Sequence, residues 1–165
     1  MQTSRGSTLK GVITISLMAV NVVFWVPILL VVALAKLLIP LAAWRRWTSA
    51  LMIWIAQAWI SCNGAIFSLM GALRLEVDGV EGLDPRSWYL VLSNHQSWVD
   101  ILVLQKAFNR RIPFLKFFLK QELIWVPFLG LAWWALDFPF MKRHSATYLQ
   151  KRPQARGEDL DATRK

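Results

Sequence analysis

Two side chains in the segment 93–100, which reads Ser-Asn-His-Gln-Ser-Trp-Val-Asp, are of types that move protons in enzymes. On one continuous helix, the five-residue step from His95 to Asp100 would turn the two side chains about 140° apart, so they would not meet. If His95 lies in a loop and a helix begins near Ser97, Asp100 stands in the first turn and can reach back to the imidazole. A carboxylate on one ring nitrogen fixes the tautomer and leaves the other nitrogen free to take a proton from a hydroxyl.

The same pattern also has a purely structural interpretation. Ser97-x-x-Asp100 is typical of a helix start, in which the Ser caps the helix and the acid lies at its positive end. His95 would then be an ordinary loop histidine. On the residue types alone, the proton-transfer pair and the capped helix start are equally open.

Residues 94–100 resemble the Asn-His-x4-Asp block of the glycerolipid acyltransferases, above all the 1-acylglycerol-3-phosphate (lysophosphatidic acid) acyltransferases. In that family the block follows a hydrophobic membrane helix or hairpin, its His is the general base and its Asp is the partner of that His. The resemblance implies these two catalytic roles for His95 and Asp100. It implies supporting roles for Asn94 and Ser97, and it implies no metal and no bound cofactor.

A second stretch, residues 138–143 with the sequence Phe-Pro-Phe-Met-Lys-Arg, resembles a later family block that ends in an Arg holding the acceptor's phosphate. The resemblance implies that Arg143 binds this phosphate, with Lys142 as its helper. A guanidinium suits the role because it holds phosphate through two parallel hydrogen bonds. Asp137 stands where the family block often has Gly. The alternative is that Lys142 and Arg143 merely end a strand in solvent.

Between these blocks, residues 120–123 (Lys-Gln-Glu-Leu) and residues 127–130 (Pro-Phe-Leu-Gly) resemble further family stretches. The third and fourth family blocks, a Glu-Gly-Thr-Arg segment and an apolar block with a Pro, do not occur in the 165 residues. The polar tail from His144 resembles an interior segment that has been cut off. The sequence therefore predicts an incomplete acyltransferase domain, and it leaves open a truncated, catalytically inactive membrane-anchored relative.

The resemblance implies a reaction of phospholipid biosynthesis. A fatty acyl chain would move from acyl-CoA or acyl-carrier protein to the free hydroxyl of a lysophospholipid such as 1-acylglycerol-3-phosphate. His95 would deprotonate that hydroxyl, whose oxygen would then attack the donor's thioester. Membrane lipids, the lysophospholipid acceptor and the acyl donor are the implied partners.

Two long runs without charged residues precede the motif, at residues 11–35 and 47–73. A helix needs about 20 residues to cross the hydrocarbon core of a bilayer. The first run is too long for the apolar centre of a signal peptide and predicts an uncleaved membrane segment. The second run has polar interruptions, so it could span, lie along the interface or fold back as half of a hairpin. Two spans or a hairpin would both place the following residues on the side where the chain began.

From residue 74 onward, short alternating and apolar stretches replace these runs. Strands are predicted at residues 75–80, 88–92, 112–118 and 136–141, and helices at residues 97–108 and 121–131, the latter broken by Pro127 and Gly130. Strands that alternate with helices predict an α/β fold. The expected organisation is a membrane-anchoring helix or helical hairpin at residues 1–73, followed by a partial α/β acyltransferase domain at residues 74–165.

The chain is basic, with a net charge of +9 and a pI of about 10.3, and 56% of its residues are hydrophobic. Nucleic acid or an anionic membrane surface would suit this charge, and the apolar content favours the membrane. The basic residues form no recognised nucleic-acid-binding motif, so no nucleic-acid partner is expected. One Cys and two His make an intramolecular disulfide impossible and a His/Cys zinc site unexpected. The expected location is integral or monotopic in a bacterial inner membrane, with the active site on the cytoplasmic face.

Overall fold

A computed structural model of the chain describes residues 5–71 and 75–142. The chain divides into two compact units, Met1–Leu115 and Lys116–Lys165. The first unit contains the helices α1 (Arg5–Leu38), α2 (Ala42–Met70) and α3 (Trp98–Phe108). The second unit contains strand β1 (Leu119–Lys120), the 3-10 helix η1 (Gln121–Trp125), helix α4 (Leu129–Ala135) and strand β2 (Phe140–Met141). The predicted domain boundary after residue 73 stays a prediction.

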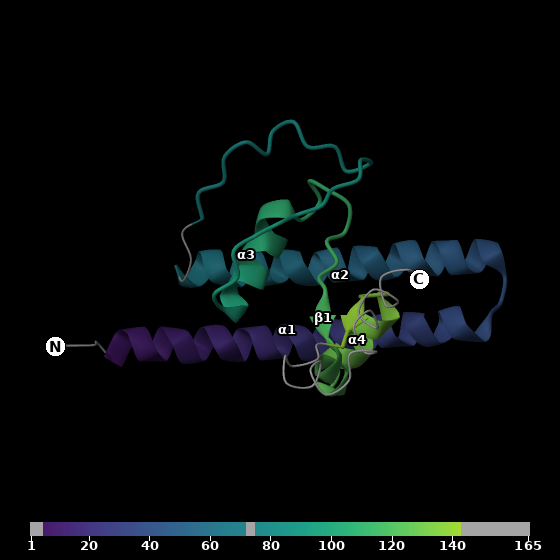
Figure 1. Ribbon diagram of the computed structural model, residues 1–165. Helices are drawn as coiled ribbons and strands as arrows, with labels where there is room; N and C mark the ends of the chain where they lie inside the picture. The colour runs from purple at the N-terminus through teal and green to yellow at the C-terminus, as the bar shows by residue number, and fades with distance from the viewer. Residues whose placement is uncertain (1–4, 72–74, 143–165) are drawn as a thin grey trace, which may run out of the picture. The chain divides into compact units, whose positions relative to one another are not determined.

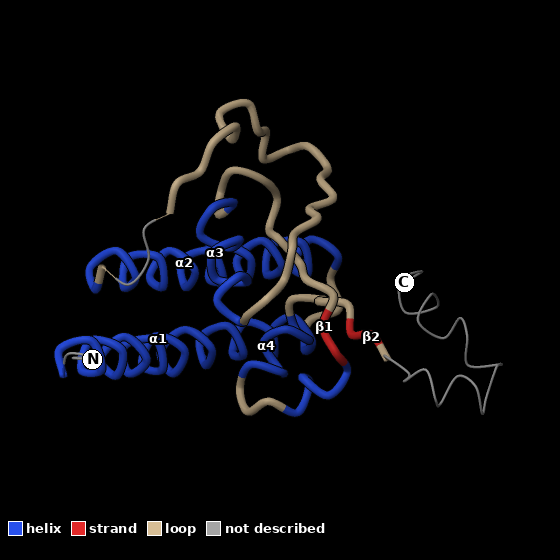
Figure 2. The backbone as a smooth tube through the Cα atoms, turned by 60° about the vertical axis from the view of Figure 1, so that its left-hand side comes forward, coloured by secondary structure: helices blue, strands red, loops and turns tan. Residues whose placement is uncertain are grey.

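Helices α1 and α2 form an antiparallel hairpin joined by residues 39–41, as Figures 1 and 2 show. α2 ends at Gly71, whose φ of 59° lies in the left-handed region that Gly enters at no steric cost and that commonly ends helices. Both helices are long enough and apolar enough to cross a membrane. This antiparallel arrangement is compatible with two membrane spans and with a hairpin that enters from one face, so both predicted alternatives stay open.

The interface of the hairpin combines an apolar core with a buried amide pair. Val26 of α1 and Met52 of α2 are each 1% exposed. Asn21 Nδ2 donates a hydrogen bond to Asn63 Oδ1 at 2.8 Å and another to the Trp59 carbonyl at 3.2 Å. A buried amide left without partners would cost about 1–3 kcal/mol, so this pairing disfavours other registers between the two helices.

The outer surface of the hairpin is also apolar. Side chains of α1 that are at least two-thirds exposed include those of Ile15, Val23, Val31 and Leu38. A helix that is apolar on all sides is stable where its surroundings are apolar, either in a protein core or in lipid. This distribution of side chains suits a membrane-associated hairpin.

The strands predicted at residues 75–80 and 88–92 are wrong, because neither segment pairs with a strand in the described part of the chain. The apolar residues of the second segment, expected to be buried, are exposed: Trp88 by 99%, Leu90 by 79% and Leu92 by 85%. A strand is stable when a neighbouring strand satisfies its backbone N–H and C=O groups. The apolar pattern predicts which side chains a strand would bury, but it does not show whether a second strand is present to pair with it.

The second unit contains a small parallel sheet, in which Lys120 of β1 lies opposite Met141 of β2. β2 falls within the strand predicted at residues 136–141, whereas β1 begins one residue after the strand predicted at residues 112–118, which the structure does not form. The parallel pair separated by helices is the α/β connection that the sequence predicts. The described residues are nevertheless mostly helical, so the α/β prediction holds only for this small sheet.

The helix predicted at residues 121–131 is divided near Pro127, where the break was expected. η1 precedes this proline and α4 follows it. Gly130 of α4 packs directly on the backbone of Ile124, and a Cβ at this position would overlap the Ile124 carbonyl group. This close approach of two backbone segments requires a residue without a side chain.

Candidate active site

The helix predicted at residues 97–108 is confirmed: α3 begins at Trp98, and Ser97 is its N-cap residue. Ser97 and Asp100 form a capping box, in which Asp100 Oδ2 accepts a hydrogen bond from the Ser97 backbone N–H at 2.7 Å. The Gln96 backbone N–H donates to the same oxygen at 2.6 Å. These bonds fix the Asp100 carboxylate through contacts within five consecutive residues.

His95 lies in the loop before α3, and its Nδ1 is 3.5 Å from Asp100 Oδ2. The His95 side chain is 62% exposed and that of Asp100 is 30% exposed. In the described part of the chain, Nε2 of His95 has no hydrogen-bond partner. The geometry that a proton-transfer pair requires, a loop His with the Asp in the first helical turn, is therefore present. The cap and the imidazole contact coexist because Asp100 Oδ2 takes part in both.

The pKa of Asp100 lies below its ordinary value of 3.8. The main causes are the hydrogen bonds from the backbone N–H groups of Ser97 and Gln96, and the charge of His95 contributes a smaller lowering. Hydrogen bonds donated to a carboxylate favour its charged form. Asp100 is therefore an anion at neutral pH, and an anion beside His95 stabilises the imidazolium that forms when the ring takes up a proton.

The two residues predicted to support the pair differ in what they contact. The Ser97 hydroxyl lies 3.4 Å from Asp100 Oδ1, so Ser97 acts on the carboxylate directly. The Asn94 carbonyl accepts a hydrogen bond from the Ser93 hydroxyl at 3.0 Å, while the Asn94 side chain is exposed. The structure thus connects Ser97 to Asp100 and does not connect Asn94 to either residue, and the supporting roles of both stay predictions.

The groups assembled at the start of α3 are one imidazole, one carboxylate and backbone N–H groups. Among residues 5–71 and 75–142, no three His, Cys, Asp or Glu side chains gather where they could hold a metal ion. The assembled groups can take a proton from a hydroxyl and stabilise the resulting imidazolium, which is the work of a general base.

The residues predicted to bind phosphate belong to the second unit. Lys142 follows β2 directly and is exposed, whereas Arg143 lies outside the described residues. Because Lys120 pairs with Met141, the parallel sheet brings residues 120–123 beside the described part of the stretch 138–143. Two of the stretches that carry the family resemblance are therefore neighbours in this unit.

Asp137 occupies the position at which the family block often has Gly. Its backbone conformation gives a physical reason why the family often has Gly there. Its φ is 57°, in the left-handed region that Gly enters freely. Asp is among the few other residues that adopt this conformation, because its short polar side chain can hydrogen-bond locally. The departure from the family pattern is thus compatible with the same turn before β2.

The residues that attach α3 to α2 were not predicted from the sequence. Four α2 positions, spaced by four, three and four residues, lie on one helix face and form what we call the polar stripe: Gln57, Ser61, Gly64 and Ser68. Their helical spacing was the available signal, because a shared polar face on an apolar helix indicates a polar neighbour.

Two residues near the end of α3 donate hydrogen bonds to the polar stripe. Lys106 Nζ donates to the Gly64 carbonyl at 3.3 Å and to Ser68 Oγ at 2.9 Å. Asn109 Nδ2 donates to the α2 backbone at the Gln57 carbonyl, at 3.2 Å, and to Ser61 Oγ at 2.9 Å. These bonds hold the helix that carries Asp100 against the hairpin.

Comparison with known proteins gives a consistent set of matches. Residues 74–163, more than half of the chain, match the family model described as Acyltransferase. Over 72 residues, 43% of the chain, it is 36% identical to the 1-acyl-sn-glycerol-3-phosphate acyltransferase alpha of Mus musculus and to that of Homo sapiens, and 35% identical to that of Ovis aries. The match covers 24% of each relative, so the chain spans about a quarter of the length of these proteins. No solved structure matches the chain significantly.

Proposed function

Because this chain belongs to the acyltransferase family, we propose that it transfers a fatty acyl chain to the free hydroxyl of a lysophospholipid. The proposed acceptor is of the 1-acylglycerol-3-phosphate class, which the names of the mammalian relatives specify for those proteins. The proposed donor is the thioester of acyl-CoA or acyl-carrier protein. The observation that carries the proposal is the 3.5 Å approach of His95 Nδ1 to Asp100 Oδ2 in the loop-to-helix segment.

In the proposed mechanism, His95 is the general base. With its Nδ1–H facing the Asp100 carboxylate, Nε2 carries the lone pair that takes the proton of the acceptor hydroxyl. The hydroxyl oxygen forms a bond to the thioester carbonyl carbon, and the carbon–sulfur bond then breaks. The departing thiolate takes the proton back from the imidazolium, so the pair returns to its starting state. Asp100 lowers the energy of the imidazolium between these two proton transfers.

The hairpin supports this function by keeping the base near the lipid acceptor. α3, whose first turn carries Asp100, is hydrogen-bonded to α2 through Lys106 and Asn109. An acceptor lying in the bilayer could then reach His95 from the side, without its acyl chain crossing water. We propose that the site lies on the cytoplasmic side of the membrane. A bacterial inner membrane stays a prediction from the sequence, and the relatives named above come from mammals.

For the acceptor's phosphate we propose Arg143, with Lys142 beside it. Lys142 is exposed at the end of β2, so its ammonium can reach a ligand. A guanidinium holds phosphate through two parallel hydrogen bonds, which orients the acceptor more strictly than an ammonium does. Arg143→Lys should therefore raise the KM for the acceptor more than Lys142→Arg does.

The direct test is acyl transfer from labelled acyl-CoA to lysophosphatidic acid in membranes containing the full 165-residue chain, from a host of low background activity. His95→Ala should lower the rate by about 10²–10⁴-fold, because loss of a general base typically costs that much. Gln96→Ala is the matched control, since Gln96 contributes its backbone N–H and not its side chain to the Asp100 contact.

Product that depends on His95 and survives Gln96→Ala supports the proposal. If both the wild type and His95→Ala give no product above background while both proteins are present in the membrane, the chain is a non-catalytic membrane-anchored relative. If His95→Ala retains the wild-type rate, His95 is not the base.

A further inference from the structure

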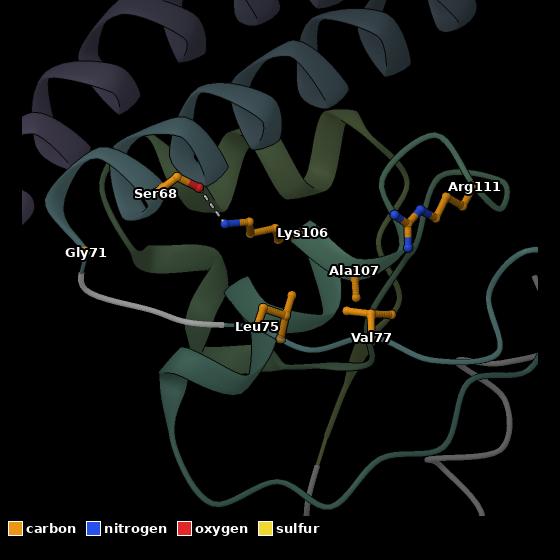
Figure 3. A pocket seen from close by; sticks show the side chains of 7 residues that line it. All are labelled: Ser68, Gly71, Leu75, Val77, Lys106, Ala107 and Arg111. Carbon is orange, nitrogen blue, oxygen red and sulfur yellow. Dashed lines mark hydrogen bonds between the residues drawn. The ribbon is translucent and has the colours of Figure 1, made fainter.

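A cavity of about 730 Å³ opens in the first unit, beside the end of α2 and the last turn of α3. Its lining combines the basic side chains of Lys106 and Arg111 with the apolar side chains of Leu75, Val77 and Ala107, as Figure 3 shows. Its volume is within the range of small-molecule binding sites, about 300–1,000 Å³. His95 and Asp100 do not line it, and Lys106 follows Asp100 by about 9 Å along the helix axis.

The cavity carries positive charge that its described lining does not neutralise. The Arg111 guanidinium has no hydrogen-bond or ion-pair partner among the described residues, and Figure 3 shows it turned towards Ala107 and Val77. Lys106 directs its ammonium to α2, where Ser68 Oγ accepts one of its hydrogen bonds at 2.9 Å. None of the described lining residues is acidic. An anion in this cavity would meet two cationic groups and no carboxylate.

The segment after α2 supplies an apolar wall to the same cavity. Leu75 and Val77 are half-buried and line it, whereas the alternating Glu76 and Asp78 are exposed and do not line it. Because polar and apolar residues alternate in this segment, the carboxylates of Glu76 and Asp78 lie away from the cavity, and the side chains of Leu75 and Val77 face it. A ligand here needs an anionic group for Arg111 and carbon-rich surface for Leu75 and Val77.

We propose that this cavity binds the headgroup region of an anionic phospholipid, with the phosphodiester on Arg111 and the adjoining glycerol and first acyl carbons on Leu75 and Val77. A guanidinium is well suited to phosphate oxygens. α2 can cross a membrane by length and composition, and the cavity begins where α2 ends at Gly71, the level at which an emerging helix meets lipid headgroups. The apolar wall favours a lipid over free phosphate. The inference goes beyond the proposed function, because it involves neither His95 nor turnover.

The test uses the full chain in detergent micelles and measures bound lipid by native mass spectrometry. The probe is dioctanoyl phosphatidylglycerol, and dioctanoylglycerol is the matched ligand that has the same acyl chains without the phosphate. Inorganic phosphate is added in a separate titration as a competitor. The variant is Arg111→Gln, and the control is Arg110→Gln, which removes the same charge from the adjacent exposed residue that does not line this cavity.

We expect wild type and Arg110→Gln to bind phosphatidylglycerol within about twofold of each other, and Arg111→Gln to bind it about tenfold more weakly. Dioctanoylglycerol should bind equally weakly to all three. The proposal is overturned if Arg111→Gln binds phosphatidylglycerol as wild type does, or if Arg110→Gln loses as much affinity. It is also overturned if millimolar inorganic phosphate displaces the lipid, because the site would then recognise the free anion.

Two further variants keep the result interpretable. Arg111→Lys preserves the charge but not the paired hydrogen-bond donors. Its affinity for phosphatidylglycerol should therefore lie between those of wild type and Arg111→Gln. Such an intermediate affinity would show that the loss is graded and does not come from unfolding. His95→Ala should bind phosphatidylglycerol as wild type does while it loses acyl transfer. Failure of lipid binding and failure of the proposed catalysis are therefore separate outcomes.

Discussion

The two ends of α3 are held by different kinds of contact. At the N-terminal end, Asp100 accepts hydrogen bonds from the backbone of Gln96 and Ser97, which are its neighbours in the chain. At the C-terminal end, Lys106 and Asn109 donate hydrogen bonds to α2 residues that lie between 38 and 52 positions earlier. One end is therefore fixed locally and the other by tertiary packing.

Because of this difference, the contacts that form the His95–Asp100 pair are not the contacts that hold α3 against α2. The approach of His95 to Asp100 requires only that the helix begin at Trp98 with its cap formed. The position of α3 beside the hairpin requires the polar stripe of α2 and the two donors that bind it. Changes at the first end should alter catalysis with little effect on stability, and changes at the second end should do the reverse.

The largest expected effect is that of Asp100→Asn. The amide keeps the shape of the carboxylate but carries no charge to stabilise the imidazolium of His95. We expect kcat/KM for acyl transfer to fall about 10²–10⁴-fold, while the thermal unfolding midpoint at neutral pH, measured by circular dichroism in detergent, falls by only about 1–2 °C. Asp78→Asn is the control, because Asp78 is an exposed carboxylate outside the pair. A rate for Asp100→Asn within about threefold of wild type would show that capping is the only work of this carboxylate.

The next largest effect is expected at the other end, for Lys106→Met. Methionine preserves most of the carbon chain that lies over Gly64 but removes the donor to the Gly64 carbonyl and Ser68 Oγ. We expect a loss of about 1 kcal/mol in unfolding free energy, which lowers the unfolding midpoint by about 2–4 °C. The kcat should stay within about threefold of wild type.

The control for this variant is Lys10→Met, because the Lys10 side chain has no partner among the described residues. Its unfolding midpoint should stay within about 1 °C of wild type. If Lys106→Met abolished turnover as completely as Asp100→Asn, chemistry and placement would not be separable and the comparison between the two ends would fail.

The same contrast explains what the sequence could predict. Ser97 and Asp100 meet within one helical turn, so residue types and spacing alone indicated the helix start and offered the approach of Asp100 to His95 as one of two interpretations. The break near Pro127 was likewise predictable, because a proline interrupts a helix through its own missing N–H and ring. The features that could be predicted depend on neighbours in the chain.

The features that could not be predicted depend on distant partners. Residues 88–92 have the composition of a buried strand, but a strand also needs a neighbour, and their apolar side chains are exposed. The polar interruptions of α2 were not interpreted as a contact surface, and nothing in their spacing identifies Lys106 and Asn109 as the residues that bind there. The roles of Lys142 and Arg143 in phosphate binding stay predictions, since Arg143 lies outside the described residues.

A smaller effect is expected when the pH is lowered. The stability contributed by Asp100 at the N-terminal end of α3 should depend on pH, and that contributed by Lys106 at the C-terminal end should not. The pKa of Asp100 is lower in the folded chain than its ordinary value of 3.8, so the stability that its ionised form contributes is complete above that value and is lost as the pH falls through the folded pKa. The difference in unfolding midpoint between wild type and Asp100→Asn should therefore shrink below a pH of about 4. The difference between wild type and Lys106→Met should stay constant, because the groups that accept hydrogen bonds from Lys106 are a backbone carbonyl and a hydroxyl, which carry no charge. Parallel acid responses of the two variants would contradict this assignment.

The smallest effect is expected for Gly64→Ala, which tests how closely α3 packs on the polar stripe. A Cβ at this position would lie 3.6 Å from Cγ and Cδ of Lys106, which is ordinary van der Waals contact. Because Ala is more favourable than Gly inside a helix by about 0.5–1 kcal/mol, the unfolding midpoint should stay unchanged or rise by about 1–3 °C. Gly130→Ala is the contrasting variant and should unfold earlier, since its Cβ would overlap the Ile124 carbonyl group. A fall for Gly64→Ala as large as that for Lys106→Met would mean that the Lys106 carbon chain lies too close to Gly64 to admit a methyl group, so that this contact as well as the hydrogen bonds of Lys106 would fix the C-terminal end of α3.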